Sequence, residues 1–201
     1  DQSEKSLLVV GTLADVVEDQ FARLFAELGI GPVHFLPPRQ ATDLPPVGTG
    51  TRLLLAQPFL GETARALLAR GAQLLEAPYP FGVEGTLSWL RAAADAFGIS
   101  AERFEAVTAM PAARATRALG RYRADLEGKR ITFLPDSQME IPLARFLQRE
   151  CGMQPVEVGT PYLDRQVLGG ELELLSAEQV SEGQHLESQL DRLRAARPDL
   201  T

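Results

Sequence analysis

Short apolar runs that alternate with longer helical stretches constrain the fold of this chain most strongly. Runs such as "SLLVVG" (6–11), "TRLLLA" (51–56) and "ITFL" (131–134) are separated by segments whose apolar residues recur at helical spacing. This alternation is typical of strands that lie buried between helices on both faces of a parallel sheet. The sequence therefore predicts an α/β protein.

The first predicted unit covers residues 1–110. Strands are expected over 6–11, 32–36, 51–56 and 72–77, and helices over 15–28, 61–70 and a segment whose buried stripe is Leu87, Leu90, Ala94 and Phe97. The Pro-rich and Gly-rich segment 37–50 is expected to form a long irregular connection, because proline cannot donate a backbone hydrogen bond.

A helix over 111–128 is expected to link this unit to a second one. Pro111 suits a first helical position, and the Ala-rich and Arg-rich segment has only a weak apolar stripe. The second unit covers 129–201, with strands expected over 131–134 and 155–158 and helices over 141–151 and up to residue 197. Ser176 and Gln179 form a candidate capping box for the last helix. Because "PDLT" (198–201) resembles the opening of a further strand, we expect this second unit to be truncated.

Composition and charge exclude several classes of protein. The formal net charge of −7 argues against binding to nucleic acid or to an anionic membrane surface. No apolar run is long enough for a membrane span, and the polar start does not resemble a signal peptide. The single cysteine, Cys151, cannot form an internal disulfide or hold a metal cluster alone. We expect a cytoplasmic protein, and the absence of an initiating Met suggests a piece of a longer chain.

Ligands of parallel sheets bind beyond the carboxyl ends of the strands, where loops and helix N-termini converge. Five predicted loops qualify: 11–15, 57–62, 77–86, 134–140 and 159–165. They are rich in proline, glycine and aromatic residues and poor in charge, which favours a large, flat, apolar ligand over a phosphate. The chain also lacks the G-x-G-x-x-G and G-x-x-x-x-G-K-[ST] motifs, so we expect it to bind neither a dinucleotide nor ATP.

The loop "APYPFGVEGT" (77–86) combines two prolines with two glycines. Proline fixes φ and glycine permits close backbone approach, so this turn is expected to form a rigid wall and to place Thr86 at a helix N-cap. A plain stiff connection between strand and helix is the alternative, and composition alone favours it.

Other polar residues have structural explanations. His34 within a strand, His185 on an acidic helix and Cys151 on an inward helix face are expected to have structural roles. Asp15, Asp136 and Asp164 follow strands and are expected to cap helices, with proton transfer as the alternative. The acidic stretch 171–199 is expected at the surface. A basic cluster on the linker is expected to be a solvated face, or a surface for an acidic partner; it consists of Arg114, Arg117, Arg121, Arg123, Lys129 and Arg130.

Four longer blocks of the sequence resemble a known family. They are "LLVVGTLADVVEDQFARLFAELGI" (7–30), "LLLAQPFLGETARALLARGA" (53–72), "APYPFGVEGTLSWLRAAADAFG" (77–98) and "GKRITFLPDSQMEIPLARFLQRECGMQPVEVGTPYLDRQ" (128–166). These blocks are similar to the N subunits of light-independent (dark-operative) protochlorophyllide reductase, which are relatives of nitrogenase component 1. The resemblance covers essentially the whole chain and implies Rossmann-like domains of the nitrogenase component 1 type, one complete and one truncated.

The resemblance implies a ferredoxin-dependent, ATP-dependent oxidoreductase that acts on a CH–CH group. It reduces ring D of protochlorophyllide to give chlorophyllide a in the (bacterio)chlorophyll biosynthesis of a photosynthetic bacterium. The N subunit would join a homologous B subunit in a heterotetramer of two N and two B and would be active only within that complex. Electrons would come from an ATP-hydrolysing iron–sulfur L protein, which carries Mg-ATP, through a [4Fe–4S] cluster. Its ligands are expected upstream of this chain and in the B subunit, so no metal ligand is assigned here.

The resemblance also implies candidate site residues. Loops 11–15 and 134–140 correspond to segments that face the active-site cofactor of nitrogenase. The residues expected to contact the pigment are Thr12, Leu13, Phe81, Pro135, Ser137, Gln138 and Met139. Asp136 is the candidate catalytic residue, as a proton carrier.

Two alternatives remain, the first in the same functional class and the second in a different one. A chlorophyllide reductase subunit, or another nitrogenase-like subunit, would share the fold and differ in substrate. A two-lobed tetrapyrrole-binding or metal-chelate-binding protein would hold its ligand between two α/β lobes without chemistry and would need no partner.

Overall fold

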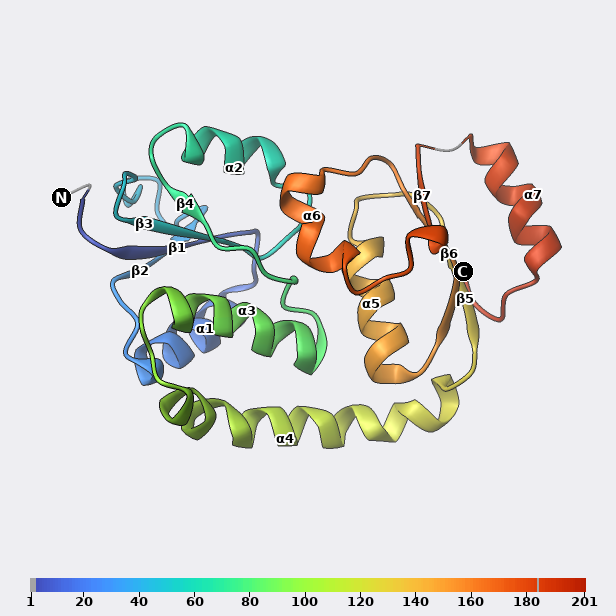
Figure 1. Ribbon diagram of the computed structural model, residues 1–201, viewed down its shortest axis with the longest axis horizontal. Coiled ribbons are helices and arrows are strands. Elements are labelled where there is room, and N and C mark those ends of the chain that lie inside the picture. Colours follow the sequence, from blue (N-terminus) through green and yellow to red (C-terminus); the bar gives the residue numbers. More distant parts are fainter. Residues whose placement is uncertain (1–2, 184) are drawn as a thin grey trace.

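Two parallel sheets lie side by side in the computed structural model, which describes residues 3–183 and 185–201 (Figure 1). We call residues 3–100, with the first sheet, the first lobe, and residues 130–201, with the second sheet, the second lobe. A long helix runs along one side of both lobes. Helices flank both parallel sheets, which confirms the predicted α/β class.

The first sheet has the strand order β2-β1-β3-β4, and all of its strand pairs are parallel. Its strands are β1 (Ser6–Val10), β2 (Val33–Leu36), β3 (Thr51–Leu55) and β4 (Gln73–Leu74). The first three confirm the predicted strands. The prediction over 72–77 is mostly wrong, because only Gln73 and Leu74 pair with β3 before the chain turns toward the second lobe.

Helices cover both faces of this sheet. They are α1 (Asp15–Leu28), α2 (Gly61–Leu68) and α3 (Gly82–Ala96). Helices α1 and α3 pack on one face and α2 on the other. Gly29 ends α1 at a φ of 84°, as its position predicts, because glycine adopts this left-handed conformation without strain. Between α1 and α3, Trp89 packs against Phe21, and its Nε1 donates to the Leu55 carbonyl at 2.7 Å.

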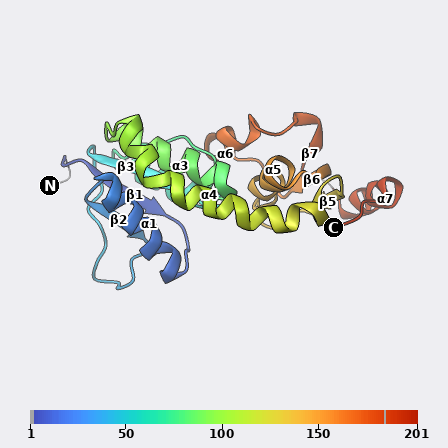
Figure 2. The same cartoon turned by 90° about the horizontal axis from the view of Figure 1, so that it is seen from below.

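Helix α4 (Ala101–Leu126) begins earlier than the helix predicted over 111–128. It starts there because the Ser100 side chain accepts a hydrogen bond from the Arg103 backbone N–H at 3.2 Å. The interpretation of Pro111 as a first helical residue is therefore wrong, since Pro111 lies inside the helix. Figure 2 shows α4 crossing both lobes, and the basic cluster of the linker is exposed to solvent. Neither α4 nor any other helix of the described residues is long and apolar enough to cross a membrane.

The second sheet has the order β5-β6-β7 and is also parallel. Its strands are β5 (Arg130–Phe133), β6 (Gln154–Thr160) and β7 (Val180–Glu182), and α5 (Glu140–Cys151) connects the first two. Strands β5 and β6 and helix α5 confirm the predicted elements. Near the end of the chain, Leu200 forms a parallel bridge with Ile131, as expected of an opening strand.

The final helix predicted to end at residue 197 is confirmed by a helix that ends at Ala196, but its start at Ser176 is wrong. The chain instead forms α6 (Arg165–Leu172), the 3-10 helix η1 (Ala177–Gln179), β7 and α7 (Leu186–Ala196). Ser176 makes no side-chain capping bond, and the Gln179 side chain donates to the Pro155 carbonyl at 2.7 Å. Gln179 is thus bound to β6 instead of completing a capping box, and β7 follows it into the sheet.

The two lobes share one hydrophobic core. Leu53 and Leu55 of β3 belong to the same buried cluster as Ile141 of α5, Val158 of β6 and Leu168 of α6. Burial of apolar side chains is the dominant favourable term in folding. Separating the lobes would expose this cluster to water. The packing of the two lobes against each other therefore contributes to the stability of the fold.

Candidate functional site

The loops that follow the parallel strands meet at the lobe boundary. In the first lobe, the Thr12 backbone N–H donates to Gln57 Oε1 at 2.8 Å, and Gln57 Nε2 donates to the Thr12 carbonyl at 3.2 Å. At the boundary, Arg65 of α2 binds Asp164 of the second lobe at 2.7 Å. Helix α2, which follows β3, therefore lies against the 159–165 loop, and strand ends are the usual place for a ligand in α/β proteins.

The three aspartates that follow strands differ in their roles. The Asp164 side chain accepts a hydrogen bond from the Gln166 backbone N–H at 3.2 Å and caps α6, which confirms the capping interpretation. Asp15 is the first residue of α1 and makes no capping bond. Asp136 precedes α5 and is exposed, and no side chain caps that helix through the N-cap position. Capping is therefore wrong for Asp15 and Asp136.

The 77–86 loop, here called the interlobe turn, binds the second lobe. The Tyr79 backbone N–H donates to Glu171 Oε1 at 2.7 Å, and Tyr79 Oη donates to the Val167 carbonyl at 2.6 Å. Burial raises the pKa of Tyr79 far above its usual value, so the hydroxyl keeps its proton and remains a donor. The prolines and glycines of this loop thus shape a docking element as well as a connection between strand and helix.

Arg145 of α5 joins the interlobe turn to α6. Its side chain is fully buried, and its Nε lies 2.8 Å from Oε2 of the equally buried Glu171. Arg145 Nη2 also donates to the Tyr79 and Phe81 carbonyls, each at 3.1 Å. Burial raises the pKa of Glu171, and the hydrogen bonds from Arg145 oppose that rise. The expectation that the acidic stretch 171–199 lies at the surface is therefore wrong for Glu171.

A second set of charges lies between α3 and α5. Arg149 binds the Glu84 carboxylate through two nitrogens, with contacts at 2.9, 2.7 and 2.6 Å, and these bonds lower the pKa of Glu84. Glu150 accepts hydrogen bonds from the Val83 and Glu84 backbone N–H groups at 2.7 and 3.2 Å. Since Glu150 satisfies these donors, α3 begins at 82, and the prediction that Thr86 caps it is wrong. The boundary carries more charge than the loop composition indicates, and these charges are paired.

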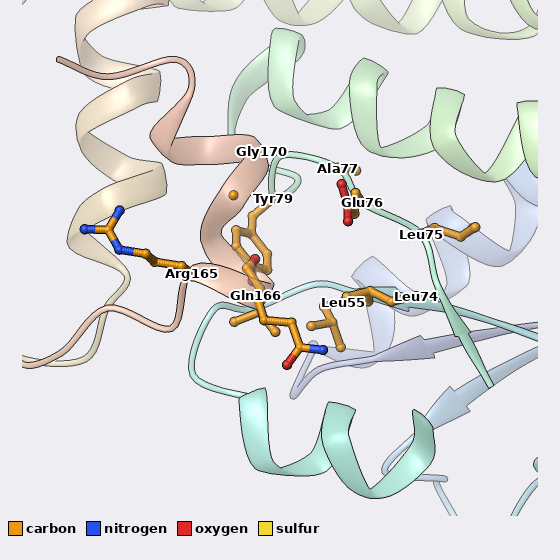
Figure 3. Close-up of a pocket in the computed structure, with 11 residues that line it drawn as sticks. Leu55, Leu74, Leu75, Glu76, Ala77, Tyr79, Arg165, Gln166 and Gly170 are labelled. Atoms are coloured by element: carbon orange, nitrogen blue, oxygen red, sulfur yellow. Dashed lines mark hydrogen bonds between the residues drawn. The ribbon is translucent and has the colours of Figure 1, made fainter. Parts of the chain in front are cut away.

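A small cavity lies between the lobes, at the carboxyl ends of β3 and β4 (Figure 3). Its volume is about 180 Å³, and Leu55, Tyr79, Gln166 and Gly170 are among its lining residues. In Figure 3 the Gln166 side chain points toward Leu55. Pockets for drug-sized ligands measure about 300–1,000 Å³. This cavity is therefore too small for the large, flat ligand that the loops predict.

The 134–140 loop, here called the wall loop, connects β5 to α5 and brings four of the predicted contact residues together. Pro135, Ser137 and Met139 are half-buried, and Gln138 is 3% exposed. The φ of Gln138 is 72°, in the left-handed region that favours glycine. Strained residues of this kind cluster at functional sites.

The other predicted contact residues lie on different elements. Thr12 is exposed after β1, and Leu13 packs against the buried cluster between β1, α1 and α3. Phe81 lies in the interlobe turn, half-buried against the shared core, and its carbonyl accepts from Arg145. Within the part of the chain that the structure describes, no hydrogen bond joins these three residues to the wall loop.

Glu140 belongs to the wall loop and escaped the sequence analysis. Its Oε1 accepts hydrogen bonds from the Asp136 and Ser137 backbone N–H groups at 2.6 and 2.8 Å. The spacing from Ser137 to Glu140 matches the S-x-x-E pattern of a capping box, in which the glutamate binds the backbone N–H three residues earlier. The S-x-x-E pattern in the sequence could therefore have indicated this role of Glu140.

The residues present do not fit an iron–sulfur cluster. Cys151 is buried against Ile131 and Met153, as predicted, and burial raises its pKa. His34 lies within β2, and His185 directly precedes α7. Among residues 3–183 and 185–201, no group of three or more His, Cys, Asp or Glu side chains is placed to hold a metal ion. A cluster needs about four ligands.

Comparison with known proteins gives consistent matches. A family model for "Nitrogenase component 1 type Oxidoreductase" matches residues 4–201. Proteins named light-independent protochlorophyllide reductase subunit N are 67% identical over 197 residues in Halorhodospira halophila and 65% identical over 195 residues in Rhodospirillum rubrum. These matches cover 98% and 96% of this chain and 46% and 44% of the relatives. The chain thus spans about half the length of the curated relatives it matches.

A solved structure titled "Nitrogenase Cp1 at pH 6.5" has a similar fold. The TM-score is 0.60 at 19% sequence identity, and the match covers 98% of this chain and 48% of that chain. At this identity the likeness shows the fold alone. The family model matches nearly every residue, and with two parallel sheets flanked by helices it shows that the chain belongs to the nitrogenase component 1 type oxidoreductases.

Proposed function

We propose that this chain is part of the N subunit of a light-independent protochlorophyllide reductase. The reaction is the ATP-dependent, ferredoxin-dependent reduction of ring D of protochlorophyllide to chlorophyllide a, in the cytoplasm of a photosynthetic bacterium. The observation that carries this proposal is the 67% identity, over 98% of the chain, to a relative named as this subunit. Membership of an oxidoreductase family supports it.

We assign the pigment-binding wall to the strand-end loops of both lobes. A flat macrocycle needs an apolar surface that excludes water, because unpaired charge in the wall would be costly to bury beside it. At the lobe boundary Arg145 is paired with Glu171 and Arg149 with Glu84, which supports this assignment. The assigned contact residues are Thr12, Leu13, Phe81, Pro135, Ser137, Gln138 and Met139.

Asp136 is assigned as a proton carrier of the wall loop. Its carboxylate is exposed beside the half-buried Pro135 and Ser137. A carboxylate can deliver a proton to a reacting carbon when it lies within hydrogen-bond reach, directly or through one water. Removal of this group is expected to lower the rate of reduction without weakening pigment binding.

The electrons come from outside the residues described here. Because no set of side chains fits a cluster, we assign the [4Fe–4S] ligands to other parts of the N and B subunits and Mg-ATP to the L protein. The active assembly is a heterotetramer of two N and two B. Within it, this chain binds the pigment and shields it from water.

A chimeric subunit tests the proposal. Residues 4–201 replace the matching segment of the Rhodospirillum rubrum N subunit, which is 65% identical, and the chimera is purified with the B and L proteins of that organism. Under anaerobic conditions with ATP and a reductant, the complex should convert protochlorophyllide to chlorophyllide, as followed by absorbance. The same mixture without ATP is the control.

Each other outcome has a definite meaning. Turnover of chlorophyllide but not protochlorophyllide would replace the proposal with a chlorophyllide reductase. Pigment binding by the isolated chain with no reduction by the complex would indicate a tetrapyrrole-binding protein. An assembled chimera that neither binds nor reduces the pigment would overturn the assignment altogether.

A further inference from the structure

The carboxylate of Glu140 organises the backbone of the wall loop. Glu140 is 6% exposed, and its Oε1 accepts from two successive backbone N–H groups, those of Asp136 and Ser137. Hydrogen bonds to an ionised acceptor are roughly twice as strong as those between neutral groups. One buried oxygen therefore fixes the loop directly after it leaves β5.

The backbone that follows is held in a strained conformation. Gln138 has a φ of 72° and is 3% exposed, and the Ile141 backbone N–H donates to its carbonyl at 3.4 Å. A residue with a side chain is less stable in this region than in a right-handed conformation, because its Cβ crowds the following carbonyl oxygen. Such a conformation persists only where its surroundings enforce it. The bonds of Glu140 lie on the N-terminal side of this residue and are one such constraint.

Two acceptors at this turn lack donors. Gln138 Oε1 and Glu140 Oε2 are both buried and have no hydrogen-bond partner among the described residues. A buried acceptor without a donor has lost its hydrogen bonds to water and gained none in the fold. Each such group in a native structure needs an explanation, and an unsatisfied pair beside a strained residue indicates that the turn receives a donor from a bound molecule or from water.

We propose that Glu140 is a positioning residue for the pigment. It holds Pro135, Ser137, Gln138 and Met139 in the arrangement that contacts the macrocycle and itself contacts no reacting atom. This inference rests on the proposed function, since it concerns the same wall. It adds a residue that affects pigment affinity by fixing the backbone of the wall loop.

Two variants of the intact complex test this role. Glu140→Ala removes both backbone hydrogen bonds, so the loop relaxes; displacements of about 1 Å can cost up to about 100-fold in a binding or catalytic step. We expect the Kd and KM for protochlorophyllide to rise at least about tenfold while kcat at saturating pigment falls less. Glu140→Gln keeps one oxygen as an acceptor and should return the Kd to within about threefold of the parent.

Glu157 provides the matched control. It is a half-buried glutamate of the same lobe, but its partners, Ser181 and Arg192, lie on β7 and α7. Glu157→Ala should lower the unfolding temperature and leave the pigment Kd unchanged. Comparable Kd values for Glu140→Ala and the parent, in assembled complexes, would overturn the inference, as would equal Kd increases for Glu140→Ala and Glu157→Ala. A parent complex that neither binds nor reduces protochlorophyllide would instead refute the proposed function.

Discussion

Arg145 and Glu171 form an ion pair at 2.8 Å in which neither side chain is exposed to solvent. The same guanidinium binds two carbonyls of the interlobe turn, so α5, α6 and the first lobe meet at one buried charge. The pair lies beside the shared apolar core, in a boundary that also holds the Arg65–Asp164 and Glu84–Arg149 ion pairs.

Removal of Arg145 should destabilise the whole chain. Arg145→Ala leaves the buried Glu171 carboxyl without its cationic partner, and breaking a buried pair costs about 3–5 kcal/mol. The free energy of unfolding, measured with urea, should fall by about this amount. Arg194→Ala breaks an exposed pair with Asp191 and should change it little. Equal stability of the two variants would contradict a structural role for the buried pair.

The pH dependence of stability should reveal the pair between Glu84 and Arg149. Hydrogen bonds from Arg149 lower the pKa of Glu84 in the folded state. A lowered carboxylate pKa contributes stability above the unfolded value of about 4.3, and this contribution is lost as the pH falls through the folded pKa. The unfolding temperatures of the parent and Glu84→Gln should therefore differ at neutral pH and converge once the pH falls below the folded-state pKa of Glu84. A difference that persists in acid would exclude this ion pair as its source.

Two glycines within helices should respond in opposite ways to substitution by alanine. At Gly85 of α3 an added Cβ collides with the Arg145 guanidinium and the Tyr79 carbonyl, whereas at Gly120 of α4 it meets open space. Gly85→Ala should lower the free energy of unfolding by about 1–3 kcal/mol through overpacking. Gly120→Ala should raise it by about 0.5–1 kcal/mol through helix propensity. Thermal unfolding of both variants tests these two predictions. Stabilisation by Gly85→Ala would show that the lobes do not pack this closely.

Glycine substitutions at two strained positions should distinguish an effect on stability from an effect on pigment binding. Gln138 and Arg197 both have positive φ, at 72° and 47°. Substitution by glycine removes a strain of about 1–2 kcal/mol at each position. Arg197→Gly should raise the unfolding temperature of the complex and leave pigment affinity unchanged. Gln138→Gly should keep the unfolding temperature at or above that of the parent and weaken pigment binding; unchanged affinity would remove Gln138 from the wall.

Sequence patterns predicted the helices and strands that have a clear signal within their own segment. Strands β1 and β3 are continuous apolar runs, and Gly29 marks the end of α1, so both signals were visible in single segments. Helix α6 was missed because "GG" at 169–170 has low helix propensity and the helix is fixed by distant partners. Strand β7 has three residues, too few for a periodic signal.

The loops of the candidate site were predicted from sequence, whereas the contacts that hold them were not. The rule that ligands bind at strand ends selected the wall loop as one of five candidate loops, and its role in ligand binding stays a prediction. The docking contacts join residues separated by as many as 99 positions, as Arg65 and Asp164 are, and no periodicity encodes such a pairing. Glu171 has no local feature that distinguishes it from its exposed neighbour Glu173, since only the folded chain brings Arg145 beside it.

The apolar cluster that runs through both lobes prevents them from opening and closing as two separate rigid bodies. Domain closure around a ligand requires two domains that separate at a low cost in free energy. Separation of these lobes would expose Leu53, Ile141 and Leu168 to water. On the proposed function, the pigment would therefore meet strand-end loops whose separation is fixed before it binds. Selection between similar macrocycles would then rest on which substituents these fixed loops accept, before any reduction takes place.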